Sequence, residues 1–124
     1  MIRIVDRRRR PAAVREFRCT VHGLCFDNRY ELLEAIHAGD ALVLLREPEN
    51  AIGADAIRVQ TVDTEIVGYV PRTISVWLAP LMDNGFEPVT RVLKVRRGCP
   101  YYERLLIEVV LQKKDPRASA RGSL

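Results

Sequence analysis

One polar segment lies between two apolar runs and holds the residue types that could do chemistry. Residues 46–55 read REPENAIGAD and contain an arginine, an amide, a glycine and three carboxylates. A hairpin loop usually needs only about two to five residues, and long ordered loops often carry function. The carboxylates could act as a paired acid and base in catalysis. Because Arg46 and Arg58 flank them, an ion-paired turn is the simpler interpretation, and we favour it.

The residue types of this loop also predict a defined conformation. Pro48 restricts the backbone, the Asn50 side chain bonds nearby backbone groups, and Gly53 is expected to adopt a positive φ. These features explain the composition of the loop but not its length. The length therefore marks the loop as a candidate binding element.

A second cluster, Cys19-x-x-His22-x-x-Cys25, has residue types that bind metals. It lies within FRCTVHGLC, whose alternation predicts a strand, and successive side chains of a strand point to opposite faces. His22 would then face away from both cysteines, whereas zinc ligands must converge tetrahedrally. We predict structural cysteines, no metal site and no cofactor.

The sequence contains no recognisable catalytic constellation. His22 and His37 are its only histidines, and no serine lies in a nucleophile elbow. Neither a phosphate-binding loop nor a dinucleotide-binding fingerprint is present. These observations predict a protein that is not an enzyme, with no catalytic residues.

Charge is distributed unevenly along the 124 residues. Residues 1–16 hold six arginines against two acidic residues, and residues 113–124 hold four basic residues against one acidic residue. The whole chain has a net charge of +4, so residues 17–112 carry a net charge of −3. Basic terminal segments are attracted to polyanions such as nucleic acid. They can also serve only to keep a protein soluble, and both interpretations stay open.

Length and composition favour one domain with its own core, because 48% of the residues are hydrophobic. We predict a flexible basic tail over residues 1–15, a folded domain over residues 16–112 and a second flexible basic tail over residues 113–124. No apolar run approaches the roughly 18 residues of a membrane-spanning helix, and MIRIVDRRRR lacks the apolar region of a secretory signal. We therefore expect a cytoplasmic location and no membrane partner.

Hydrophobic periodicity predicts the elements that position these residues. We expect strands over residues 16–25, 41–47, 56–62, 65–70, 88–97 and 103–112, and helices over residues 29–37 and 73–85. Short strands with tight connections favour a mainly β fold with two short helices. Closing such a sheet into a small barrel would remove its exposed edges.

A few positions carry more specific expectations. Segment 41–47 is apolar along most of its length, which predicts a strand that is buried on both faces or lies deep in a barrel. Gly68 inside a strand predicts a bulge or the close approach of another group. In the second helix, Thr73 is expected to cap the N-terminus and Pro80 to kink or split the helix. Trp77 lies on the apolar stripe of this helix and is expected in the core.

Three motifs occur in order at a specific spacing: Arg46-Glu47-Pro48-x-Asn50, Ala56-Ile57-Arg58-Val59 and Gly68-Tyr69-Val70-Pro71-Arg72. With the helix that follows them, they resemble the HIRAN domain family. The resemblance runs from about Phe17 to Gln112 and implies a small, modified OB-like β-barrel. It also implies binding of single-stranded DNA, in particular a free 3′-hydroxyl end, as in the eukaryotic fork-remodelling members, and hence a link to DNA repair. Short stand-alone bacterial members are the closer analogy.

By motif position, the resemblance also implies a nucleic-acid-binding site. Its expected residues are Phe26, Asn50, Ile52, Tyr69, Arg72, Tyr101 and Tyr102. Arg72 takes the position of a cation that contacts phosphate. Phe26 matches an aromatic residue of the first loop, and Tyr69 stands where the eukaryotic DNA binders have an imidazole. Tyr101 and Tyr102 lie in the last loop, where the family has an aromatic wedge. Stacking on a base is worth roughly 1–3 kcal/mol.

The chain departs from the family pattern at three positions. Cys25 stands where the family commonly has arginine, and Ile52-Gly53 stands where it has a Tyr-Asp pair. In that pair the tyrosine is the stacking platform and the aspartate reads the hydroxyl. Isoleucine has no π face and glycine has no side-chain acceptor, so we expect weakened 3′-hydroxyl specificity.

Two functions are compatible with these features. The leading one is a non-enzymatic nucleic-acid-binding module for single-stranded DNA or DNA ends. The basic tails support it, as do the basic residues of the domain, namely Arg72, Arg91, Lys94, Arg96 and Arg97. The alternative is a protein-interaction module on the same barrel, whose DNA site has decayed. The net charge of −3 over residues 17–112 favours this alternative, because a strand-binding groove should be positive.

Overall fold

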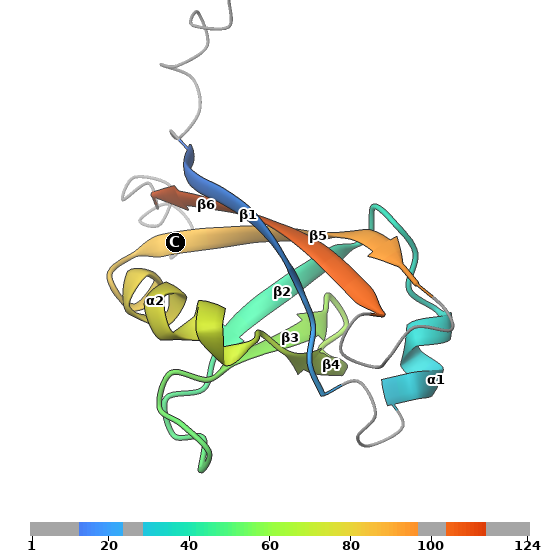
Figure 1. Ribbon diagram of the computed structural model, residues 1–124, viewed down its shortest axis with the longest axis horizontal. Coiled ribbons are helices and arrows are strands. Elements are labelled where there is room, and N and C mark those ends of the chain that lie inside the picture. The colour runs from blue at the N-terminus through green and yellow to red at the C-terminus, as the bar shows by residue number, and fades with distance from the viewer. Residues whose placement is uncertain (1–12, 24–28, 97–103, 114–124) are drawn as a thin grey trace, which may run out of the picture.

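The computed structural model describes residues 13–23, 29–96 and 104–113. Within these residues, six strands and two helices follow one another in the order expected from the sequence (Figure 1). The elements are β1 (Ala13–Thr20), α1 (Arg29–Glu34), β2 (Ala41–Arg46), β3 (Ile57–Thr61), β4 (Ile66–Tyr69), α2 (Arg72–Asp83), β5 (Phe86–Val95) and β6 (Leu105–Lys113). Neither of these helices is long and apolar enough to cross a membrane.

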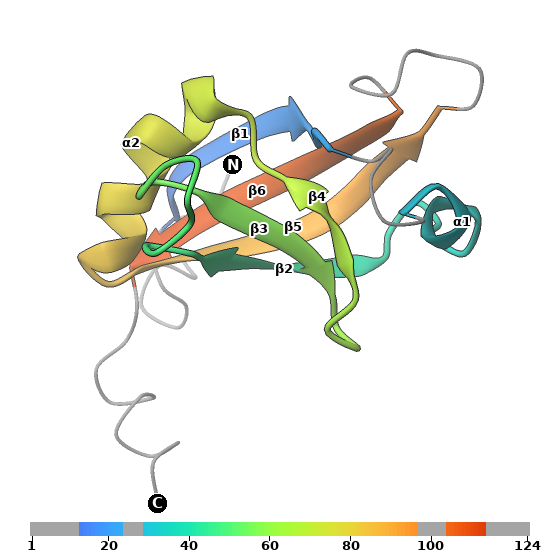
Figure 2. The same ribbon diagram turned by 90° about the horizontal axis from the view of Figure 1, so that it is seen from below.

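All six strands form one antiparallel sheet in the order β1-β6-β5-β2-β3-β4. The sheet curls until its two edges meet, and α1 and α2 lie at opposite ends of it (Figures 1 and 2). Just beyond β1, the His22 N–H donates to the Tyr69 carbonyl at 2.9 Å, and the Tyr69 N–H donates to the His22 carbonyl at 2.8 Å. The expected mainly β, OB-like fold is confirmed. The six strands form a curled half-barrel, and this isolated bridge is the point where its two edges meet.

Gly68 permits this junction because it has no side chain. A Cβ built on Gly68 would lie 2.6 Å from Val21 Cγ1 and closer still to the His22 carbonyl oxygen. The ladder between β3 and β4 is also irregular here, with a register shift beside Val59, the partner of Gly68. Both expectations for this glycine, a bulge and a close approach, are confirmed.

The core fills the concave side of the curled sheet. β6 contributes its alternate side chains, and Leu105, Ile107, Val109 and Leu111 are all fully buried. Cys19 is also buried among the core residues, and burial raises the pKa of its thiol to about 11. The interpretation of Cys19 as a structural residue is confirmed.

The structure corrects the expected start of β1, the expected end of α1 and the expected burial of β2 on both faces. β1 begins at Ala13, before the expected start, and α1 ends at Glu34 rather than at residue 37. β2 is buried on one face only: Leu42 and Leu44 point into the core, whereas Val43 and Leu45 are 37% and 40% exposed. Among the described residues no element covers the outer face of β2, and its apolar side chains are exposed there.

The expectations for the ends and interior of α2 also need correction. The helix begins at Arg72 with Pro71 at its N-cap and no side-chain cap, so Thr73 lies inside the first turn. Pro80 lies within a continuous helix and does not split it. Pro80 and Val76 are both exposed. The Val76 carbonyl, which loses its usual partner at Pro80, can therefore bond water instead.

Trp77 covers the edge of the core instead of lying within it. Its side chain is half-buried, and its ring meets Phe17 edge-on with the centroids 5.0 Å apart. The Arg15 guanidinium carbon lies 3.9 Å from the Trp77 ring centroid, at the distance of a cation–π contact. Leu78 is the fully buried residue of this part of α2.

Replacing Gly68 with alanine should destabilise the fold, because the new methyl group would collide with backbone of the closing bridge. We expect Gly68→Ala to lower the free energy of unfolding by about 1–3 kcal/mol. Urea denaturation followed by Trp77 fluorescence measures this change. The matched control is Gly53→Ala, whose methyl group would meet only the ends of the Asp55 and Arg72 side chains. Equal losses in the two variants would contradict the role given to Gly68.

Candidate functional site

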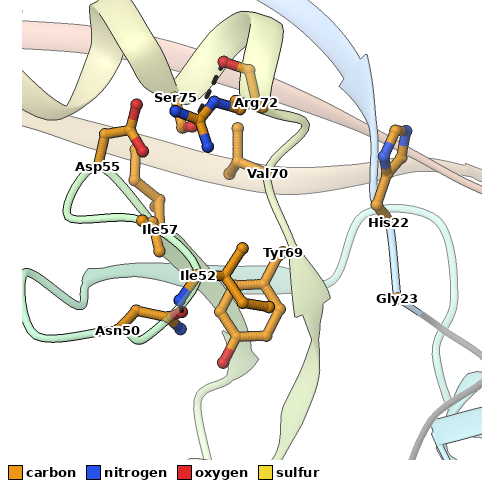
Figure 3. A pocket seen from close by; sticks show the side chains of 12 residues that line it. His22, Gly23, Asn50, Ile52, Asp55, Ile57, Tyr69, Val70, Arg72 and Ser75 are labelled. Carbon is orange, nitrogen blue, oxygen red and sulfur yellow. Dashed lines mark hydrogen bonds between the residues drawn. The ribbon is translucent and has the colours of Figure 1, made fainter.

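A pocket of about 490 Å³ opens where the β2–β3 loop, the end of β4 and the start of α2 meet (Figure 3). The loop lies beside α2 in both ribbon views (Figures 1 and 2). The pocket is lined by His22, Gly23, Asn50, Ile52, Gly53, Asp55, Ala56, Ile57, Tyr69, Val70, Arg72 and Ser75. We call it the loop pocket. Its walls combine aliphatic side chains with opposite charges and hydrogen-bonding groups.

The loop pocket brings together four of the residues expected in the site: Asn50, Ile52, Tyr69 and Arg72. They come from two separate segments, the polar loop and the β4–α2 junction. The other three expected residues, Phe26, Tyr101 and Tyr102, lie outside the described residues, as do Cys25 and Arg97.

Glu47 organises the loop, and sequence reasoning missed this role. Its Oε1 accepts hydrogen bonds from the Asn50 side-chain amide at 2.8 Å and from the Tyr69 hydroxyl at 3.0 Å. Its Oε2 lies 3.2 Å from Arg58 Nη1. One carboxylate thus ties the loop to β3 and β4. The Glu47-x-x-Asn50 spacing was the available sequence signal, but the contact with Tyr69 spans 22 residues.

Backbone hydrogen bonds fold the loop back on itself. The Glu47 N–H donates to the Ala56 carbonyl at 3.0 Å, and the Ala56 N–H donates to the Gly53 carbonyl at 3.2 Å. The Ile52 N–H donates to Asn50 Oδ1 at 2.8 Å, as expected for an asparagine that bonds the local backbone. Gly53 does not have a positive φ, so that expectation is wrong. No backbone requirement therefore demands a glycine at position 53.

The two arginines that flank the loop have different partners. Arg58 pairs with Glu47, as expected, whereas Arg46 bonds Asp83 of α2 through Nε at 3.0 Å. Arg46 also donates to the Ala56 carbonyl at 2.9 Å. The hydrogen bond from Arg46 to Asp83 holds the pKa of the Asp83 carboxyl below the usual value. Arg46 therefore connects the loop to α2. The sequence does not indicate this contact, because Arg46 and Asp83 are 37 residues apart.

Two charged side-chain ends lie close beside Gly53. A Cβ built on Gly53 would lie 3.1 Å from Asp55 Oδ1 and 3.3 Å from Arg72 Nη1. Figure 3 shows the Asp55 carboxylate and the Arg72 guanidinium on the same side of the pocket, facing each other. Within the described part of the chain, neither charged group makes a hydrogen bond or ion pair.

Aliphatic groups supply most of the remaining wall. Ile57 and Val70 are buried at the base of the loop pocket, whereas Ile52 is 88% exposed on the loop. An exposed isoleucine offers apolar contact area but no π face. The position therefore cannot act as an aromatic stacking platform.

Arg91, another basic residue expected to help, is already engaged by a carboxylate. Arg91 Nε bonds Glu108 Oε1 at 2.9 Å, and this carboxylate also lies 3.8 Å from Arg18. These residues occupy the outer face of the sheet, away from the loop pocket. Among the described residues, no group of three or more histidines, cysteines or acidic residues is arranged to hold a metal ion.

A curled antiparallel sheet with this loop pocket defines a class of small β-barrel binding domains. The chain belongs to the HIRAN domain family, whose model matches residues 14–114. The resemblance identified from the sequence motifs is therefore confirmed.

A solved protein from Lactobacillus plantarum has the same fold, with a TM-score of 0.68 and 28% identity. The match covers 83% of this chain and 99% of that one. The HIRAN domain of HLTF in its DNA-bound conformation also shares the fold, with a TM-score of 0.58 and 22% identity over 91% of this chain and 87% of that one.

A curated relative is the Fanconi-associated nuclease 1 homolog of Arabidopsis thaliana. It is 36% identical over 89 residues, which are 68% of this chain and only 9% of the relative. The chain therefore corresponds to one small segment of that nuclease homolog.

Removing the Glu47 carboxylate should loosen the loop, because Asn50, Arg58 and Tyr69 would lose their shared partner. We expect Glu47→Ala to lower the free energy of unfolding by about 1–3 kcal/mol in urea denaturation. Glu49→Ala is the matched control, since Glu49 is an exposed carboxylate of the same loop. It should change stability by no more than about 0.5 kcal/mol. If the two variants lose the same stability, Glu47 does not organise the loop.

Proposed function

We propose that this chain is a non-enzymatic DNA-binding module that takes the end of a single strand into the loop pocket. The observation that carries the proposal is the Arg72 guanidinium, which borders the pocket without a partner among the described residues. The shared fold with the HLTF HIRAN domain in its DNA-bound conformation supports it. An arginine in this position is suited to a backbone phosphate, which it can bind with two parallel hydrogen bonds.

The pocket walls fit the remaining parts of a nucleotide. Ile57 and Val70 form the buried apolar base of the pocket, and Ile52, exposed at the rim, offers apolar contact to a sugar or base. Because Ile52 cannot stack and Gly53 cannot bond a hydroxyl, binding should depend less on the identity of the strand end than the family pattern implies. We extend the proposal to a role in DNA repair in a bacterial cytoplasm, by analogy with the family.

A protein-interaction module on the same barrel is the second candidate. The net charge of −3 over residues 17–112 favours it, because this charge weakens attraction to DNA. The exposed apolar residues Val43, Leu45 and Val89 on the outer face of the sheet also favour it. Absence of measurable DNA binding would support this candidate.

The basic terminal segments should supply much of the affinity for DNA. β1 begins at Ala13 and β6 ends at Lys113, so a variant limited to residues 13–113 keeps every strand. We expect it to bind single-stranded DNA more weakly than the full chain, with a flatter dependence on salt. Each lost phosphate contact should reduce the logarithmic salt slope by about 0.7. Fluorescence anisotropy at several salt concentrations measures both quantities, and identical slopes would show that the segments contribute nothing.

The loop pocket should distinguish poorly between 3′-hydroxyl and 3′-phosphate ends. Losing a stacked ring and a charged hydrogen bond could remove on the order of 1–3 kcal/mol each. We expect the two affinities to differ by less than about tenfold. The measurement is competition by unlabelled strands against a labelled oligonucleotide. One competitor has a 5′-phosphate and a 3′-hydroxyl, and the other has the reverse, so their charges match.

The double variant Ile52→Tyr with Gly53→Asp should restore a preference for the hydroxyl. The backbone permits the change because Gly53 does not adopt a positive φ, and its nearest neighbours are flexible side-chain ends. A preference of tenfold or more in the unmodified protein would contradict the proposed loss of specificity.

A further inference from the structure

Most hydrogen-bonding side chains of the loop pocket are already engaged within the protein. The Asn50 amide and the Tyr69 hydroxyl both donate to Glu47, and the Ser75 hydroxyl lies 3.5 Å from the Arg72 carbonyl. Using these groups for a ligand would first break contacts that hold the loop. They are therefore poor candidates for reading a strand end.

Asp55 and Arg72 differ from these groups. Both line the loop pocket, and within the described residues neither charged group is engaged by a hydrogen bond or an ion pair. Asp55 is half-buried, so its carboxylate has lost part of its hydration without gaining a partner. A polar group in this state gains most from a ligand that supplies the missing hydrogen bond.

The Asp55 and Arg72 side chains converge beside Gly53. The point where a Cβ would stand on Gly53 is 3.1 Å from Asp55 Oδ1 and 3.3 Å from Arg72 Nη1, so both charged ends lie close to the same part of the loop. Both also line the loop pocket, where they present an acceptor and a donor to neighbouring groups of one nucleotide.

We propose that Asp55 determines the end specificity of the loop pocket, which deepens the function proposed above and rests on it. The Asp55 carboxylate accepts a hydrogen bond from an uncharged terminal hydroxyl, while Arg72 binds the phosphate that precedes it. The same carboxylate repels a terminal phosphate. Asp55 thus supplies the small preference for a hydroxyl that remains in a pocket without the Tyr-Asp pair.

Charge, not shape, is what distinguishes the two ends in this arrangement. A carboxylate has only acceptor oxygens, so it can bond a hydroxyl but not an ionised phosphate. Converting Asp55 to asparagine keeps the size of the side chain, removes the negative charge and adds two N–H donors. The variant should therefore tolerate a phosphate in the place where the carboxylate repels it.

The test measures the ratio of affinities for the two charge-matched competitor strands, in the full chain and in Asp55→Asn. We expect the substitution to shift the ratio toward the 3′-phosphate strand by about threefold to tenfold, the effect of one partly exposed charge. The matched control is Asp63→Asn. Asp63 is an exposed carboxylate in the turn between β3 and β4 and does not line the loop pocket. The Asp63→Asn substitution removes the same charge from the protein and should leave the ratio of the two affinities unchanged.

The outcomes separate this inference from the function on which it rests. If the full chain binds neither strand, both the proposed function and the role of Asp55 are overturned. If it binds both strands and Asp55→Asn leaves their ratio unchanged, DNA binding stands and the role of Asp55 is overturned. An equal shift in Asp63→Asn also overturns that role, because the effect would then come from net charge alone.

Discussion

The close approach of the chain around Gly68 is the constraint on which the rest of the structure depends. The segment after β1 can reach β4 only because no side chain projects from this glycine. The two hydrogen bonds between His22 and Tyr69 then join the edges of the sheet. This junction also decides where the loop pocket forms, since His22 and Tyr69 both line it. The residue that closes the fold is therefore next to the residues that build the site.

Glu47 couples this closure to the loop. Through Tyr69 it contacts the strand that the bridge holds, and through Asn50 it contacts the loop itself. The same contacts have a chemical consequence, because they occupy two of the polar groups that a ligand could otherwise use. The charges left for a ligand in the described part of the pocket are those of Asp55 and Arg72. The contacts that order the loop therefore leave fewer polar side chains available to a ligand.

The departures from the family pattern have a physical meaning in this setting. Gly53 has no side chain where an aspartate would stand, and the charged ends of Asp55 and Arg72 lie close beside it. Ile52 keeps the loop apolar at its rim without offering a ring. The pocket remains, but its chemistry depends on side chains that come from the neighbouring positions of the loop and from α2. A shared fold therefore does not by itself transfer the specificity of one family member to another.

The sequence by itself determined the order of strands and helices, because strand alternation and helical stripes are local patterns. It also indicated the loop, the special role of Gly68 and the residues Asn50, Ile52, Tyr69 and Arg72. Only the tertiary structure decided that Arg46 pairs with Asp83 instead of a loop carboxylate, that Glu47 holds Tyr69, and that Asp55 faces Arg72. It also decided that the outer face of β2 is exposed and that Trp77 is only half-buried. These features depend on which distant segments meet when the sheet curls, and sequence periodicity carries no information about contacts between segments so far apart along the chain.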